Sequence, residues 1–157
     1  MGMRVGLGVD AHRLEPGVPL VIGLVPIEHP TGLAGHSDGD VVAHAVCDAL
    51  LAAAGGPDIG VLFPPGAPEW KGVTGAAMIA HVLEWLRGEG ADPVNVHAVI
   101  MCEKPRIGPH RGAMQEALTR AVGAPVSVHA TTTDRMGFTG REEGIACQAV
   151  ALVEVGA

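Results

Sequence analysis

An aspartate and two histidines are spaced so that they can hold a metal ion. Asp10 and His12 lie two residues apart at the end of a predicted strand, so their side chains point to the same face. His44 lies on a predicted helix, one turn after Asp40 and one turn before Asp48. Two ring nitrogens and one carboxylate oxygen around an open fourth position are typical of a catalytic zinc site. The same spacing also fits a hydrogen-bonded core histidine and an aspartate that only ends its strand.

The polar segment before that helix offers a second group of functional side chains. His36, Ser37, Asp38, Gly39 and Asp40 lie where free backbone N–H groups and the helix dipole favour an anion. His36 at this position can contact a phosphate or a proton on a phosphate oxygen. Ordinary helix capping explains the segment as well, with Ser37 as the N-cap and Asp40 in the position of the capping-box glutamate.

A third group of polar residues follows a predicted strand in the last quarter of the chain. Thr131, Thr132 and Thr133 present successive hydroxyls that can donate to phosphate oxygens. Asp134 can bind a hard cation, and Arg141 can make charge-assisted contacts. A polar hairpin is the alternative interpretation. The sequence contains neither a Walker motif nor a dinucleotide-binding glycine fingerprint, so neither common nucleotide motif explains the site.

Interleaved strands and helices must position these groups. Hydrophobic alternation and turn residues predict strands over residues 4–9, 20–22, 25–28, 94–101, 126–131 and 145–155, with 20–22 and 25–28 forming a hairpin. Helical spacing predicts helices over residues 41–53, 74–87 and 109–121. This order favours an α+β fold with one domain over residues 1–157, a mixed β-sheet and helices packed on one face.

The composition excludes several classes of protein. A formal net charge of −7 argues against a nucleic-acid surface, and it means that metal ions must balance much of the charge of a phosphate ligand. No apolar stretch reaches the roughly 18 residues that cross a bilayer, and the N-terminus has no signal-peptide pattern, so we expect a cytoplasmic protein without membrane contact. Cys47, Cys102 and Cys147 lie in apolar contexts and are predicted core residues. A hydrophobic content of 48% suggests that subunit contacts cover part of the surface.

Motifs occur in a recognisable order along nearly the whole chain. They are Gly8–His12, His36–Val41, His44-Ala45, Asp48–Leu51, Asp58–Gly60, Phe63-Pro64 and Thr131–Ala146. Together they resemble the cyclodiphosphate synthase family of the non-mevalonate isoprenoid pathway, and residues 36–40 are a highly specific part of the match. The resemblance implies conversion of 4-diphosphocytidyl-2-C-methyl-D-erythritol 2-phosphate to 2-C-methyl-D-erythritol 2,4-cyclodiphosphate, with release of CMP.

The resemblance also implies a role for each polar group. Asp10, His12 and His44 would bind one zinc ion, while His36 and Thr132 would stabilise the transition state. Asp134 would hold a second ion, Mg²⁺ or Mn²⁺, on the substrate diphosphate, and residues 102–108 would form the cytidine pocket. The family assembles as a homotrimer with its active sites between subunits. The substrate-binding residues implied in this way are Asp10, Ala11, His12, His36, Ser37, Asp58, Ile59, Gly60, Thr131, Thr132, Thr133, Asp134, Phe138 and Arg141.

The chain departs from the family pattern in two places. Asp134 is shorter than the glutamate that is common there, so its contact with a cation is either direct or through a water. Residues 65–67 follow Phe63-Pro64 without the acidic residues that the family often has, so no contact is expected from them. Two other functional classes stay open: a zinc-dependent phosphoester hydrolase, and a non-catalytic protein that binds an isoprenoid diphosphate in an oligomer channel near Arg141.

Overall fold

A five-stranded mixed sheet forms the centre of the molecule, in a computed structural model that describes residues 2–156. Its strand order is β4-β1-β7-β5-β6, and only β5 and β6 run parallel to each other. The hairpin β2–β3 forms a separate two-stranded sheet. The strands are β1 (Gly2–Pro16), β2 (Leu20–Ile22), β3 (Val25–Ile27), β4 (Thr31–Leu33), β5 (Ala91–Met101), β6 (Val126–Thr131) and β7 (Gly144–Val155).

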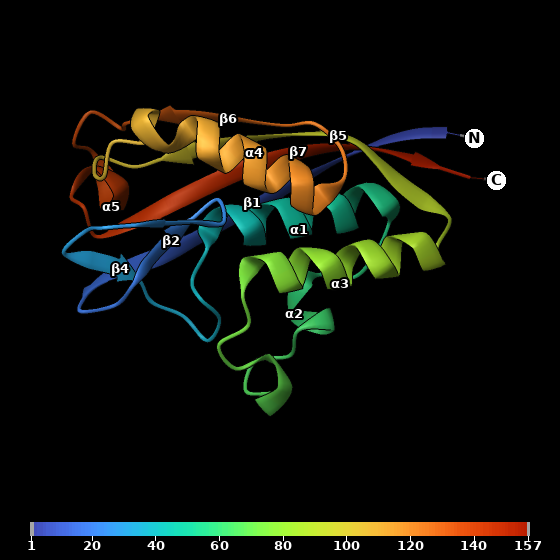
Figure 1. The fold of residues 1–157 in the computed structure, drawn as a ribbon, viewed down its shortest axis with the longest axis horizontal. Helices are drawn as coiled ribbons and strands as arrows, with labels where there is room; N and C mark the ends of the chain where they lie inside the picture. The colour runs from blue at the N-terminus through green and yellow to red at the C-terminus, as the bar shows by residue number, and fades with distance from the viewer. Residues whose placement is uncertain (1, 157) are drawn as a thin grey trace.

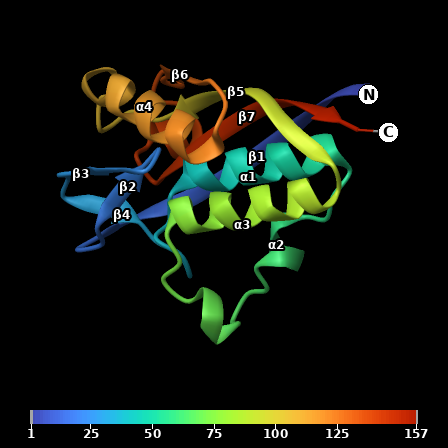
Figure 2. The ribbon, with the colours of Figure 1, turned by 45° about the vertical axis from the view of Figure 1, so that its right-hand side comes forward.

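The long helices cover one face of the sheet. Helix α1 packs on β1 and β7, α4 packs on β6, and α3 lies against α1 and α4 (Figures 1 and 2). None of the helices in the described residues is long and apolar enough to cross a membrane. The helices are α1 (Val41–Ala54), α2 (Ile59–Leu62), η1 (Pro68–Trp70), α3 (Gly75–Gly88), η2 (Gly108–His110), α4 (Arg111–Val122) and α5 (Gly137–Gly140).

Two glycines of β1 allow α1 to lie directly on the sheet. A Cβ atom at Gly6 would collide with the α1 backbone at Ala49 and Ala53, and one at Gly8 would collide with it at Ala45 and Ala49. Because side chains alternate along a strand, Asp10 and His12 point to this same helix-covered face. The close approach of α1 to β1 therefore brings His44 above Asp10.

On the opposite face of the sheet, the part formed by β1 is apolar and uncovered in the single chain. Val5, Leu7 and Val9 alternate with the glycines of β1 and are 69%, 57% and 54% exposed. Val150 of β7 pairs with Leu7 and extends the same face. An exposed apolar surface of this kind marks a contact with another molecule.

The expected α+β class, with a mixed sheet and helices on one face, is confirmed. The predicted strands and long helices are present with small shifts of their ends, and β1 extends well beyond residue 9. The prediction that Ser37 is the N-cap of α1 is wrong, because the N-cap is Asp40. Strand β4 and the short helices α2, η1, η2 and α5 were not predicted, and α5 lies in the polar segment that follows β6.

Candidate metal centre and active site

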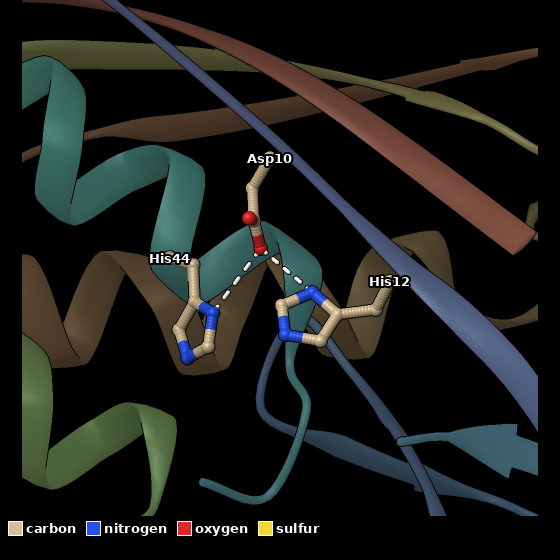
Figure 3. A group of neighbouring side chains, drawn as sticks. All are labelled: Asp10, His12 and His44. Carbon is tan, nitrogen blue, oxygen red and sulfur yellow. Dashed lines mark hydrogen bonds and ion pairs between the residues drawn. The ribbon is translucent and has the colours of Figure 1, made fainter. Parts of the chain in front are cut away.

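Asp10 and His12 of β1 converge with His44 of α1, as their spacing predicts (Figure 3). The expectation that Asp10 and His12 end their strand is wrong, because β1 continues to Pro16. Asp10 Oδ2 lies 2.8 Å from His12 Nδ1 and 3.1 Å from His44 Nδ1. One ligand atom from each residue lies within 4.8 Å of the others. These residues can therefore hold a divalent metal ion.

The environment of the three side chains fits a metal ion. His12 Nδ1 is buried 2.8 Å from Asp10 Oδ2, but among the described residues it has no partner that is well aligned for a hydrogen bond. Burial raises the pKa of Asp10, but contacts with His12 and His44 outweigh burial and hold the pKa below its ordinary value. The carboxylate is therefore charged and its neighbouring nitrogens face it, which is the state that a metal ion needs.

Two neighbours fix the orientation of the histidine rings. Ser37 Oγ lies 2.9 Å from His44 Nε2, which leaves Nδ1 directed at Asp10. A Cβ atom at Gly35 would lie 3.1 Å from His12 Cδ2, so the missing side chain at Gly35 makes room for the ring. Partners of this type set the tautomer of a ligating histidine and tune its affinity for metal.

The two aspartates of residues 36–40 hold the local structure. Asp40 is fully buried, and its carboxylate accepts hydrogen bonds from the backbone N–H groups of Val42 and Ala43 in α1 and of Gly23 and Leu24 in the hairpin turn. Asp38 accepts from the backbone N–H of Gly75 at the start of α3. The capping interpretation is thus correct for the aspartates, which leaves His36 and Ser37 to face the site.

A cavity of about 190 Å³ opens beside the three metal-site residues. His12, His36, Ser37 and His44 form its polar end, and Ile59 and Gly60 lie on its wall as the resemblance implies. Its apolar end is formed by Phe63, Pro64, Pro65, Trp70, Val73 and Met78. Phe63-Pro64 is one of the matched motifs, whereas the other four residues were not predicted. The expectation of no contact from residues 65–67 is wrong for Pro65, which lines the cavity. Asp58 lies exposed before α2, where its side chain caps nothing.

A second cleft, of about 410 Å³, lies at the end of β6. Its lining includes Cys102, Ile107, Thr131 and Thr132, so it coincides with the predicted cytidine segment. Thr131 Oγ1 donates to the carbonyl of Thr132, and Thr133 Oγ1 donates to the carbonyl of Met136. Thr132 Oγ1 donates to no acceptor within residues 2–156, so its hydroxyl is available to a ligand.

The two clefts are not brought together within one chain. Strand register aligns Asp10 with Cys147, Cys147 with Ile100, and Ile100 with Ala130. Three strand spacings therefore separate Asp10 from the residue before Thr131, which is about 14 Å. Within the described part of a single chain, the metal-site residues and the threonines at the end of β6 therefore lie in separate clefts.

The remaining predicted residues lie at the edges of these clefts. Ala11, His12 and Phe138 line a third cleft of about 220 Å³. Arg141 Nη2 lies 3.3 Å from Glu143 Oε2. Asp134 is exposed and has a left-handed backbone, with φ of 53°. Its predicted role as a cation ligand stays a prediction.

The cysteines are free and buried, as predicted. Burial raises the pKa of Cys102 to about 12, so this residue of the second cleft is a neutral thiol. Its Sγ–H donates to the carbonyl of Pro105. Because thiolates rather than thiols are nucleophiles, the thiol of Cys102 does not supply a nucleophile.

Comparison with known proteins decides the family. The model of the YgbB family matches residues 3–154. The chain belongs to the YgbB family. Among its relatives, 2-C-methyl-D-erythritol 2,4-cyclodiphosphate synthase of Porphyromonas gingivalis is 48% identical over 153 residues, which are 96% of this chain and 94% of the relative. The protein of the same name from Cutibacterium acnes is 49% identical, over 98% of this chain and 92% of the relative.

The fold of this YgbB-family chain also matches solved structures. One is a 2C-methyl-D-erythritol-2,4-cyclodiphosphate synthase in a form with bound CDP, which is 34% identical and has a TM-score of 0.88. The match covers 96% of this chain and all of the solved chain. The YgbB family and its fold are therefore established for this protein.

Proposed function

We propose that the chain is a 2-C-methyl-D-erythritol 2,4-cyclodiphosphate synthase, an enzyme of isoprenoid precursor synthesis that releases CMP. The observation that carries the proposal is the convergence of Asp10, His12 and His44 at the polar end of a cavity. Its YgbB-family relatives with this name cover nearly the same length of chain. By reaction type the enzyme is a phosphorus–oxygen lyase that acts as one domain over residues 1–157, and we expect it in the cytoplasm.

The reaction needs no protein nucleophile. An oxygen of the substrate's own 2-phosphate attacks the β-phosphorus, and the bond from that phosphorus to the oxygen that bridges to the α-phosphorus breaks. CMP leaves with the bridging oxygen and its electron pair, so the atoms balance without water. The protein must hold the two phosphates close together and in line, and such positioning can lower a barrier by about 7 kcal/mol or more.

Two ion sites account for the charge of the substrate in a chain of net charge −7. Asp10, His12 and His44 would hold zinc, since two nitrogens and one oxygen with an open fourth position suit that ion. Asp134 would hold Mg²⁺ or Mn²⁺ on the diphosphate. Bound at these places, the ions supply Lewis-acid polarisation of phosphoryl oxygens.

Residues of the metal-site cavity and of the cleft at the end of β6 would bind the rest of the substrate. Asp58, Ile59 and Gly60, with His36 and Ser37, would hold the methylerythritol part beside the metal centre. The cleft at the end of β6 would hold the cytidine. A solved relative with bound CDP supports a nucleotide as the ligand of this chain. His36 and the free hydroxyl of Thr132 would donate to phosphate oxygens as negative charge develops on them.

A second copy of the chain would complete the active site. Three strand spacings, about 14 Å, separate Asp10 from Ala130, which is two residues before Thr132, so we expect that one phosphate cannot contact both the metal centre and Thr132 of the same chain. The exposed face with Val5, Leu7 and Val9 offers an apolar surface for such a copy. If each chain contacts the next through two different surfaces and the ring closes after three copies, the chains form a homotrimer with one site at each interface. An isoprenoid diphosphate in the channel of that trimer, near Arg141, stays a prediction.

Metal depletion followed by product analysis tests this function. Chelation should abolish CMP release from the substrate, and addition of Zn²⁺ with Mg²⁺ should restore it. Phosphorus NMR should show two mutually coupled resonances of a cyclic diphosphate, formed in equal amount to CMP. A linear phosphate product would instead identify a hydrolase, and tight binding without CMP release would identify a non-catalytic binding protein.

A further inference from the structure

Three aromatic rings pack together and attach the outer wall of the metal-site cavity, which is formed by residues 59–73, to helix α3. Phe63 and Trp70 belong to the wall, and His81 lies on α3. The ring centroids are 4.7 Å apart for Phe63 and Trp70, 5.3 Å for Phe63 and His81, and 5.0 Å for Trp70 and His81. Each ring therefore contacts both of the others, at tilted or edge-on angles that aromatic side chains prefer.

Side-chain packing, rather than polar contacts, attaches this wall to α3. Trp70 Nε1 is buried and has no hydrogen-bond partner in the part of the chain that the structure describes. Within that same part, no side-chain hydrogen bond or ion pair joins residues 59–72 to α3. His81 is only partly buried, and the helix residues before and after it that face inward, Met78 and Val82, belong to the core.

Backbone hydrogen bonds join this wall to the segment that contains His36. Trp70 is followed closely by Gly72, whose backbone N–H donates to the carbonyl of His36 at 2.8 Å. The carbonyl of Val73 accepts from the backbone N–H of Asp38 at 3.0 Å. A shift of Trp70 therefore moves the segment that carries His36 and Ser37 as well as the apolar wall of the cavity.

We propose that His81 is a positioning residue, which holds the wall formed by residues 59–73 and, through it, sets the place of His36. The inference rests on the proposed function for its effect on catalysis. His81 touches neither the metal-site residues nor the cavity, so it acts only through Phe63 and Trp70. The imidazole serves here as a flat ring, so another aromatic ring can replace it.

Substitution of His81 separates positioning from simple stability. His81→Ala should lower kcat/KM for CMP release about tenfold, because small displacements of an active-site group cost that much or more. His81→Phe should restore kcat/KM to within about twofold, since it keeps the ring contacts. Glu84→Ala, an exposed change one turn along α3, is the matched control and should behave as wild type. Wild-type kcat/KM in His81→Ala, or an equal loss in His81→Ala and His81→Phe, would overturn the inference.

Trp70 fluorescence tests the packing of the three rings independently of catalysis. The chain has two tryptophans, so Trp85→Phe leaves Trp70 as the only indole. In this background, His81→Ala should raise the acrylamide quenching constant of Trp70 about twofold or more, because loss of a packed ring opens the indole to solvent. An unchanged quenching constant would overturn the role of His81. Absence of CMP release from the wild-type chain would overturn the proposed function instead, so the two failures are distinguishable.

Discussion

Ser37 contacts the metal centre through His44 rather than through the ion site itself. Its Oγ lies 2.9 Å from Nε2 of the ring, whose other nitrogen faces Asp10. Loss of a partner in this position typically weakens metal binding about 10- to 100-fold. We therefore expect Ser37→Ala to lower Zn²⁺ affinity at least about tenfold, as measured by competition with a chelator. Ser127→Ala, an exposed serine on β6, is the control, and equal affinity of the two variants would remove Ser37 from the metal site.

The threonines at the end of β6 differ in what their hydroxyls contact. Thr133 Oγ1 lies within 2.8 Å of both the Met136 carbonyl and Thr139 Oγ1, so its hydroxyl holds the loop. We expect Thr132→Val to lower kcat at least about tenfold with little change in Tm. The Thr132 hydroxyl would donate to a phosphate oxygen as negative charge develops on it, and valine cannot donate. Thr133→Val should lower Tm, because it breaks internal hydrogen bonds. The reverse pattern would assign the catalytic hydroxyl to Thr133.

Sequence reasoning reached the metal-site residues for a simple geometric reason. Asp10 and His12 share a face because they are two residues apart on a strand, whatever the rest of the fold does. The position of His44 depends on the approach of α1 to Gly6 and Gly8, which spacing alone did not reveal. The resemblance to a known family, rather than periodicity, joined it to the other two.

At the scale of elements, the Asp40 carboxylate joins the β2–β3 hairpin to the start of α1. It accepts from four backbone N–H groups, two in each element, and complete burial raises its pKa while the N–H groups of Leu24, Ala43 and Gly23 oppose the rise. We expect Asp40→Ala to lower the free energy of unfolding by about 2 kcal/mol or more, since a cap is lost and buried donors are left unpaired. Chemical denaturation measures the change.

A second aspartate provides the matched control for this prediction. Asp58 is the N-cap of α2, but its side chain makes no capping hydrogen bond and is exposed. Asp58→Ala should therefore leave the stability nearly unchanged while it weakens substrate binding. A similar loss of stability in both variants would contradict the special role of Asp40.

The elements that were predicted are those whose signal is local. Residues 74–87 show helical spacing, a threonine cap and an inward apolar stripe, and α3 begins and ends within one residue of that range. The spacing of Ser37 and Asp40 resembles a capping box, which predicts Ser37 as the cap. The N-cap is instead the buried Asp40, and its burial depends on the hairpin packed against it. Strand β4 exists only because the extended end of β1 pairs with it, which is a tertiary effect.

At the scale of the whole molecule, the order of the strands decides how the site is built. No local pattern predicts that β7 and β5 lie between β1 and β6, so the sequence could not reveal that Thr132 is remote from Asp10. The uncovered apolar face is similarly invisible in the sequence, where Val5, Leu7 and Val9 look like any buried strand. Composition indicated only that some surface must be covered.

Mixed assemblies test the shared active site most directly. One parent, His44→Ala, lacks the metal centre, and the other, Thr132→Val, lacks the hydroxyl at the end of β6. If each site combines the metal centre of one chain with Thr132 of the next, random mixed trimers contain both intact halves in about a quarter of their sites. Sedimentation at about three times the chain mass of 16.0 kDa verifies assembly of each sample.

The decisive measurement is the rate of CMP release after the two variants are unfolded together and refolded. We predict recovery of about a quarter of the wild-type rate, while each variant refolded alone stays near its own low rate. A mixture no more active than the average of its parents, or an active monomer, would contradict a site shared between chains.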